Sequence, residues 1–183
     1  MTDIYKPHPS DNFETPEDLF QWLDALFHFE MDICANRYNH KCKKYISPEE
    51  NSFEYDWDCT SYMNPPYRQL MAVKRTPWMR QAADDAREFG VNIACLVKAA
   101  TETKWFDIGW REASLILFFS KRITFVDPDT GEAAGSGARF PNALLVFGEL
   151  DEPGRYAKYL SQRGTVVLPE VGIFNSKAEG ENE

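Results

Sequence analysis

The sequence lacks any apolar run that approaches the length of a membrane span, and its first residues contain no apolar segment typical of a secretory signal. We therefore expect a cytoplasmic protein without a membrane partner. Its four cysteines, Cys34, Cys42, Cys59 and Cys95, contain no CxxC pair and are expected to be free thiols. A zinc site built from Cys34, His40, Cys42 and Cys59 is an alternative, although these spacings match none of the usual zinc-binding pairs.

Positive charge is also scarce, with 20 Lys and Arg against 29 Asp and Glu, which gives a net charge of −9. This balance argues against a simple nucleic-acid-binding protein, because such proteins are usually basic. The charge is unevenly distributed: residues 1–60 carry −8, residues 61–125 carry +4 and residues 126–183 carry −5. An acidic protein with one basic face can still bind phosphates, because the local potential matters more than the sum.

The length of 183 residues favours a single domain over residues 1–175, followed by a disordered acidic tail at 176–183. A helix is predicted to start with Thr15 as its N-cap and Pro16 as its first helical residue. The expected strands are 28–34, 44–47, 60–63, 91–97, 114–119, 121–126 and 143–147, and further helices are expected at 77–89 and 102–113. This alternation predicts an α/β fold with a central, mostly parallel sheet flanked by helices.

The most informative motif is Asn64-Pro65-Pro66-Tyr67, which follows a short β-prone run at 61–63. It should therefore lie at the carboxyl end of a strand, where open α/β sheets bind ligands. The two prolines donate no backbone hydrogen bonds, and Asn64 is kept out of helical conformation by the proline after it. We expect a stiff turn that offers an amide oxygen, carbonyl groups and an aromatic face to a planar substrate with an exocyclic amino group. A simple proline-rich turn after an edge strand is the structural alternative.

Three residues elsewhere are candidates for binding a small molecule. Thr15 at a helix start can receive a carboxylate, or it is a plain N-cap. Asp32 at the end of a strand can receive an ammonium group, or it is a loop carboxylate satisfied by its neighbours. Asp56 can accept a hydrogen bond from an adenine ring beside Trp57, although Trp57 itself is typical of a core residue.

Two segments are candidates for binding a larger substrate. In the first, which follows the strand at 91–97, Trp105 and Phe106 either stack on a substrate base or belong to the core. The second segment is Arg139-Phe140-Pro141-Asn142, which ends a flexible loop suited to phosphate contact. A loop that only connects two strands has a similar composition.

In their order along residues 11–147, these motifs resemble the phage-type DNA N6-adenine methyltransferase family. The resemblance rests on the following segments: Asp11-Asn12-Phe13-Glu14-Thr15-Pro16, Phe29-Glu30-Met31-Asp32-Ile33-Cys34-Ala35, Asn39-His40-Lys41-Cys42 with Tyr45, Asp56-Trp57, Asn64-Pro65-Pro66-Tyr67, Thr101-Glu102-Thr103-Lys104-Trp105-Phe106, Arg122-Ile123-Thr124-Phe125 and Phe140-Pro141-Asn142.

The resemblance implies a Rossmann-like fold and a site-specific enzyme that transfers a methyl group from S-adenosyl-L-methionine to the N6 amino group of a flipped adenine in DNA. It also implies a phage or prophage origin and a role in modification or in evasion of host restriction, with no metal and no obligate protein partner. The catalytic residues would be Asn64, Pro65, Pro66 and Tyr67. The cofactor-binding residues would be Thr15, Pro16, Asp32, Cys34, Ala35 and Asp56. The substrate-binding residues would be Tyr67, Arg68, Lys98, Trp105, Arg122, Arg139 and Phe140.

The sequence departs from the family pattern at two places. The segment after Asp32 contains no glycine-rich cofactor loop, and Lys98 and Ala100 stand where proline and arginine are expected. These departures keep open the alternative of a non-catalytic DNA-binding relative. A methyltransferase that acts on RNA or on a protein glutamine is the other alternative, because such enzymes also use an Asn-Pro-Pro-Tyr turn.

Overall fold

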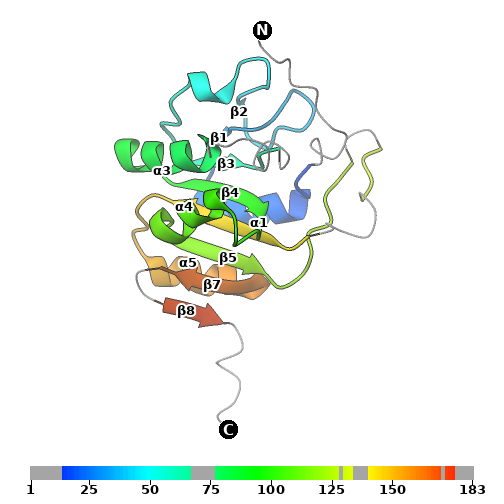
Figure 1. The fold of residues 1–183 in the computed structure, drawn as a ribbon. Helices are drawn as coiled ribbons and strands as arrows, with labels where there is room; N and C mark the ends of the chain where they lie inside the picture. The colour runs from blue at the N-terminus through cyan, green and yellow to red at the C-terminus, as the bar shows by residue number, and fades with distance from the viewer. Residues whose placement is uncertain (1–13, 67–76, 128–129, 134–139, 170–171, 176–183) are drawn as a thin grey trace.

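The computed structural model describes residues 14–66, 77–127, 130–133, 140–169 and 172–175. Its strands form one eight-stranded sheet in the order β2-β1-β3-β4-β6-β5-β7-β8 (Figure 1). The strands are β1 (Met31–Asp32), β2 (Lys44–Tyr45), β3 (Ser61–Met63), β4 (Ile93–Lys98), β5 (Leu115–Phe119), β6 (Asn142–Phe147), β7 (Gly164–Leu168) and β8 (Gly172–Asn175). The helices are α1 (Glu17–Phe27), α3 (Pro77–Phe89), α4 (Lys104–Glu112) and α5 (Pro153–Leu160), with short 3₁₀ turns η2 (Ser52–Glu54) and η3 (Ser161–Arg163).

The sheet is mixed, which corrects the expectation of a mostly parallel one. β2, β1, β3 and β4 pair in parallel, whereas β6 runs antiparallel to both β4 and β5, and the pairs β5–β7 and β7–β8 are also antiparallel. A parallel neighbour requires a crossover connection, usually through a helix. The described residues between β5 and β6 contain no helix, so β6 returns directly beside β5 in the opposite direction.

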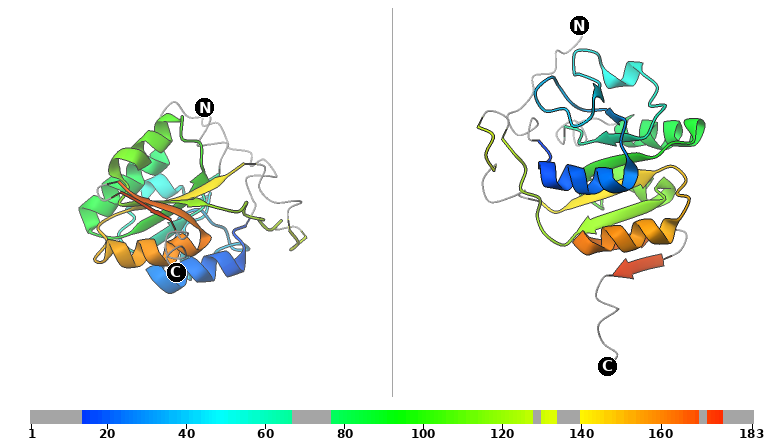
Figure 2. Two further views of the ribbon diagram at one scale, coloured as in Figure 1. Left: turned by 90° about the horizontal axis from the view of Figure 1, so that it is seen from below. Right: turned by 180° about the vertical axis from the view of Figure 1, so that it is seen from behind.

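Helices cover both faces of the sheet (Figure 2). Successive side chains of β4 point to opposite faces of the sheet and so belong to two parts of the core. Ile93, Cys95 and Val97 pack with α3 and α4. Ala94 and Leu96 pack with α1 and α5. Every residue of β6 is buried. Continuous apolar strands of this kind are typical of a sheet that is covered on both faces.

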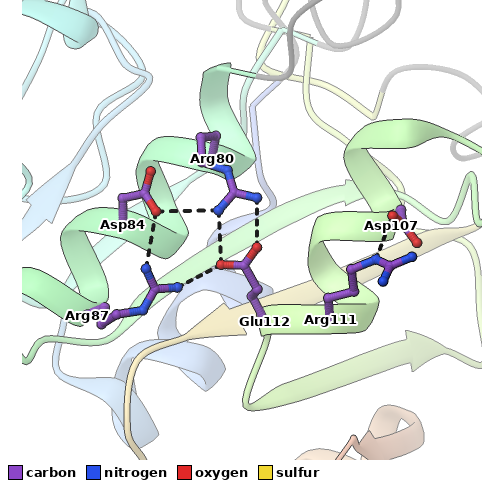
Figure 3. A network of polar contacts seen from close by, with 6 residues as sticks. All are labelled: Arg80, Asp84, Arg87, Asp107, Arg111 and Glu112. Atoms are coloured by element: carbon purple, nitrogen blue, oxygen red, sulfur yellow. Dashed lines mark hydrogen bonds and ion pairs between the residues drawn. The ribbon is translucent and has the colours of Figure 1, made fainter.

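An ion-pair network joins α3 to α4 on one of these faces (Figure 3). The Glu112 carboxylate at the end of α4 receives hydrogen bonds from Arg80 Nη2 at 2.7 Å and from Arg87 Nη2 at 2.7 Å. Asp84 accepts from the same two guanidinium groups at 3.4 and 3.3 Å. Two guanidinium groups on α3 therefore share one carboxylate on α4, which fixes the two helices against each other.

Several predicted elements are confirmed, including the helix at 77–89, for which the structure gives the same bounds. The strand expected at 121–126 is wrong, because among the described residues this segment forms isolated bridges of Val126 to Glu14 and to Ala133 and no strand. α5, β7 and β8 were not predicted. The expected acidic tail at 176–183 lies outside the described residues. In the described part of the chain, no helix is long and apolar enough to cross a membrane.

Candidate active site

The candidate site lies at the carboxyl edge of the sheet, where β1 and β3 are parallel neighbours. From β1 the chain moves outward to β2, and it then returns to β3 on the other side of β1. Such a reversal of strand order opens a crevice at the carboxyl ends of the two strands, and α/β proteins bind ligands there. Asp32 ends β1, and Asn64 directly follows β3. The two residues singled out in the sequence therefore lie at the same edge of the sheet, at the position between the ends of β1 and β3 that we call the crevice.

The turn after β3 is firmly embedded at its start. Met63 and Pro65 are buried, and Asn64 and Pro66 are half-buried. Because Pro65 and Pro66 carry no N–H group, this turn presents carbonyl oxygens without competing backbone donors. The predicted catalytic Tyr67 and the predicted substrate-binding Arg68 lie outside the described residues.

Asp32 is a buried carboxylate with 3% of its surface exposed. Its Oδ1 accepts a hydrogen bond from the backbone N–H of Cys34 at 3.3 Å, and its Oδ2 accepts one from the N–H of Lys41 at 3.0 Å. Burial raises the pKa of Asp32 from 3.8 to about 6, and the two backbone hydrogen bonds oppose this rise. A carboxylate in this position favours an approaching cation, which would offset the cost of its burial.

The start of α1 is fixed to the same edge by two contacts. The Thr15 hydroxyl lies 2.6 Å from the phenol oxygen of Tyr62 on β3. Lys41, which follows β1, forms an ion pair with Glu17 at 3.1 Å. The prediction that Thr15 caps the helix is wrong, because the N-cap is Pro16 and no side chain caps it. Thr15 instead joins α1 to the strand that leads into Asn64.

The remaining predicted cofactor residues are distributed between two places. Cys34 is half-buried and Ala35 is buried directly after Asp32, so both lie at the crevice. Burial, followed by the charge of Asp32, raises the pKa of the Cys34 thiol well above its usual value, so this group stays protonated. Asp56 lies elsewhere: it is exposed in the segment before β3, where the adjacent Trp57 is held against α3 by Asp85. Trp57 is completely buried, in agreement with its core interpretation.

The predicted substrate residues meet at the end of β4. The Lys98 ammonium lies 4.1 Å from the centroid of the Phe140 ring. The N–H of Ala99 donates to the carbonyl of Pro141 at 2.9 Å and fixes the approach to β6. Trp105 in the first turn of α4 is 3% exposed, and its indole Nε1–H has no hydrogen-bond partner within the part of the chain that the structure describes.

Two further predicted substrate residues belong to the connection between β5 and β6. Arg122 is exposed in the segment after β5. Arg139 lies outside the described residues. The structure therefore pairs Lys98 with Phe140 at the end of β4, buries Trp105 in the first turn of α4, and places Arg122 in the segment after β5.

Comparison with known proteins identifies the family of this chain. The model of the DNA N-6-adenine-methyltransferase (Dam) family matches residues 4–167. The chain belongs to this family. It is 30% identical over 146 residues to a DNA N-6-adenine-methyltransferase of Haemophilus phage HP1, a match that covers 78% of this chain and 81% of the phage protein. It is 27% identical over 161 residues to a DNA N-6-adenine-methyltransferase of Escherichia phage T1, with coverage of 78% and 64%.

The structure also shows two contacts at the candidate site that the sequence motifs did not reveal. Tyr62 and Lys41 hold α1 and the loop after β1 in place, yet neither was among the predicted site residues. The signal for Tyr62 was faint, since one tyrosine in a three-residue strand gives no indication of a partner so distant in sequence. The zinc alternative receives no support, because among the described residues no three His, Cys, Asp or Glu side chains converge on a common point. The four cysteines are free thiols, as expected.

Proposed function

We propose that the crevice between β1 and β3 is the catalytic centre of a DNA methyltransferase that transfers a methyl group from S-adenosyl-L-methionine to the N6 amino group of adenine. The observation that carries this proposal is the position of the Asn64-Pro65-Pro66 turn directly after β3, beside the buried carboxylate that ends β1. This arrangement offers acceptors for an amino group and a negative charge for a cationic ligand at one edge of the sheet.

The residues of the crevice fit the cofactor. Its amino-acid ammonium would pair with Asp32, which is buried and whose carboxylate gains from a cationic partner. Its carboxylate would lie near the start of α1, close to Thr15 and Pro16, where the first N–H groups of the helix have no intrahelical partner. Cys34 and Ala35 would form the adjoining wall. When bound, S-adenosyl-L-methionine supplies an activated methyl group on a sulfonium.

The turn after β3 prepares the accepting nitrogen. An aromatic amine is a poor nucleophile because its lone pair is shared with the ring. The Asn64 amide oxygen and the Pro65 carbonyl would accept its two N–H hydrogens and favour a pyramidal nitrogen with more electron density. Tyr67 would stack on the ring. The rate enhancement therefore comes from the positioning of the amino group and from the hydrogen-bond acceptors directed at it, and a strong base is not required.

A base in a duplex is out of reach of this crevice, so the adenine must be extruded. Lys98 and Phe140 form a cation–aromatic pair at the end of β4, which can support a nucleotide beside the pocket. The Nε1–H of Trp105, which has no hydrogen-bond partner among the described residues, is a buried donor that an acceptor atom on the base would satisfy. Lys98 would supply positive charge close to the position where the family pattern has an arginine. Arg68 and Arg139 would contact the flanking DNA.

We infer that residues 1–175 form one Rossmann-like unit that carries both binding functions. Asp56 was predicted to contact the adenine ring of the cofactor, and that role stays a prediction. A phage or prophage origin, activity in the cytoplasm of the host cell, and a role in modification or in evasion of restriction agree with the phage relatives.

The decisive experiment is methyl transfer from labelled S-adenosyl-L-methionine to unmethylated duplex DNA, followed by digestion and separation of the nucleosides. Label in N6-methyladenine is the expected result. Transfer to RNA or to protein glutamine instead would move the substrate assignment to those classes. Cofactor binding without transfer to any of the three would identify a non-catalytic relative.

A further inference from the structure

A hollow lies at the same edge of the sheet, between the start of α1, the segment after β5 and η3. It has a volume of about 440 Å³. Its charged lining consists of Lys121, Arg122, Arg163 and Asp18, and Leu19 and Ile123 contribute apolar surface. Three cations and one carboxylate thus surround a cavity in a chain whose net charge is −9.

One of the cations is held in place before any ligand arrives. The Arg163 guanidinium lies 4.7 Å from the centroid of the Trp22 ring and 3.5 Å from Asp18 Oδ2. Lys121 and Arg122 are both exposed, and Lys121 has no ion-pair partner among the residues described. A preorganised guanidinium with two exposed cations beside it is suited to a phosphate group.

The hollow is connected to the candidate active site through α1. β5 points in the same direction as β3 and β4, because β6 is antiparallel to both β4 and β5. The carboxyl ends of β3 and β5 therefore lie at one edge of the sheet. Pro16 lines the hollow, while the preceding Thr15 contacts Tyr62, two residues before Asn64.

We propose that Lys121, Arg122 and Arg163 form a phosphate-binding pocket that holds one backbone phosphate of the DNA strand beside the extruded adenine. This inference rests on the proposed function. The pocket contributes position and affinity without reading sequence, because a phosphate carries no base identity. The apolar surface of Leu19 and Ile123 would face the adjoining sugar.

The test measures the affinity of the protein for a DNA duplex that the wild-type protein methylates. Binding is measured in the presence of S-adenosylhomocysteine and at several salt concentrations. The variants are Lys121→Ala, Arg122→Ala and their combination. Arg163 is left unchanged because its contacts with Trp22 and Asp18 give it a structural role. The matched control is Arg111→Ala combined with Arg155→Ala, which removes the same charge from exposed side chains on α4 and α5.

We expect each pocket substitution to weaken DNA binding roughly threefold to tenfold, and to reduce the slope of log affinity against log salt by about one per lost phosphate contact. The control double variant should change neither quantity by a comparable amount. A series of duplexes, each with one neutral methylphosphonate linkage, identifies the phosphate that is bound. At one position in the DNA this linkage should weaken binding by the wild-type protein but cause no further loss for the Lys121→Ala, Arg122→Ala double variant.

Two results would overturn the proposal. If the pocket and control variants shift the salt slope equally, the effect is only one of overall charge. If the pocket variants instead weaken cofactor binding and leave the DNA salt slope unchanged, the hollow serves the cofactor. Failure of the proposed function is distinguishable from both, since the wild-type protein would then not methylate the duplex at all.

Discussion

The Thr15 hydroxyl and the Tyr62 phenol oxygen lie 2.6 Å apart in the interior, although 47 positions separate them in the sequence. Thr15 precedes α1, and Tyr62 is the central residue of β3. This hydrogen bond holds the helix start against the strand that carries the Asn64-Pro65-Pro66 turn. It thereby links the expected cofactor contacts to the expected acceptors for the adenine amino group.

Removing both hydroxyls should destabilise the protein by less than the sum of the two single losses. Tyr62→Phe and Thr15→Val each leave one buried hydroxyl without this partner, and we expect each to lower the free energy of unfolding by about 1–2 kcal/mol. The double variant should lose less than the sum, with a coupling of about 1 kcal/mol in a double-mutant cycle measured by denaturant unfolding. Strict additivity would contradict the role assigned to this contact.

The same single variants should weaken cofactor binding because the helix start is displaced. Tyr159→Phe is the matched control: its hydroxyl donates to the Trp22 carbonyl of α1 at 3.0 Å, away from the crevice. It should reduce stability and leave the cofactor affinity measured by calorimetry unchanged. An equal loss of affinity in the control would mean that binding reports only on overall stability.

Asp32 should give the protein a distinctive pH dependence. Its pKa is raised from 3.8 to about 6, so between these values the folded protein binds a proton that the unfolded chain has released. Stability is therefore lost as the pH rises through this window, by about 3 kcal/mol in total. Asp32→Asn should remove this part of the pH dependence of stability. The measurement is the free energy of unfolding of the wild-type and variant proteins at pH 3.5 and at pH 8, and the difference between the two proteins should change between these pH values.

Cofactor affinity should show the opposite trend in the wild-type protein. Only the ionised Asp32 pairs with an ammonium group, so binding should weaken about tenfold per pH unit below its pKa and level off above it. Asp32→Asn should bind weakly at every pH. If the wild-type affinity is the same at pH 5 and pH 7, Asp32 does not receive the ammonium.

Local signals explain which parts of the molecule were predictable. Pro77 and Gly90 bracket a helical apolar pattern, and the structure gives α3 the expected bounds. Gly90 has a φ of 66°, which a residue without a side chain adopts at low cost at the end of a helix. The strand before Asn64 was recognised for a similar reason, because the two prolines end it sharply.

The failures occurred where tertiary contacts override local pattern. Ile123 and Phe125 alternate like residues of a strand, but both are buried against the core beneath α1 and α5, and the segment belongs to none of the strands of the described residues. Thr15 has the residue type of an N-cap, but its hydroxyl contacts Tyr62 instead. The insertion of β6 between β4 and β5 was also unpredictable locally, because strand order depends on pairing between distant segments.

The α3–α4 ion network predicts a salt-dependent contribution to stability. Hydrogen bonds from Arg80, and further contacts with Arg87, hold the pKa of Glu112 below its usual value. We expect Glu112→Gln to lower the free energy of unfolding by about 1 kcal/mol near neutral pH and low salt. A group with a lowered pKa stabilises the fold above its unfolded pKa of 4.5, so the difference from wild type should shrink as the pH falls below that value and through the lower folded pKa.

Asp107→Asn provides the control for this network. Among the described residues, Asp107 pairs with Arg111 on its own helix, at 2.8 Å, and both side chains are largely exposed. Its loss should cost less than about 0.5 kcal/mol. Thermal or denaturant unfolding at two salt concentrations separates the two variants, and equal effects would show that Glu112 does not join the helices in solution.

The catalytic assignment is tested most directly at the turn after β3. Asn64→Ala should abolish methyl transfer and leave cofactor affinity near normal, because the amide oxygen is assigned to the adenine amino group and Asp32 to the cofactor. Tyr67, which lies outside the described residues, should tolerate Phe better than Ala, since stacking requires the ring and not the hydroxyl. Single-turnover rates and cofactor titrations distinguish the two roles. Near-normal methylation by Asn64→Ala would refute the proposed mechanism, and equal losses in the two Tyr67 variants would exclude stacking as the function of that ring.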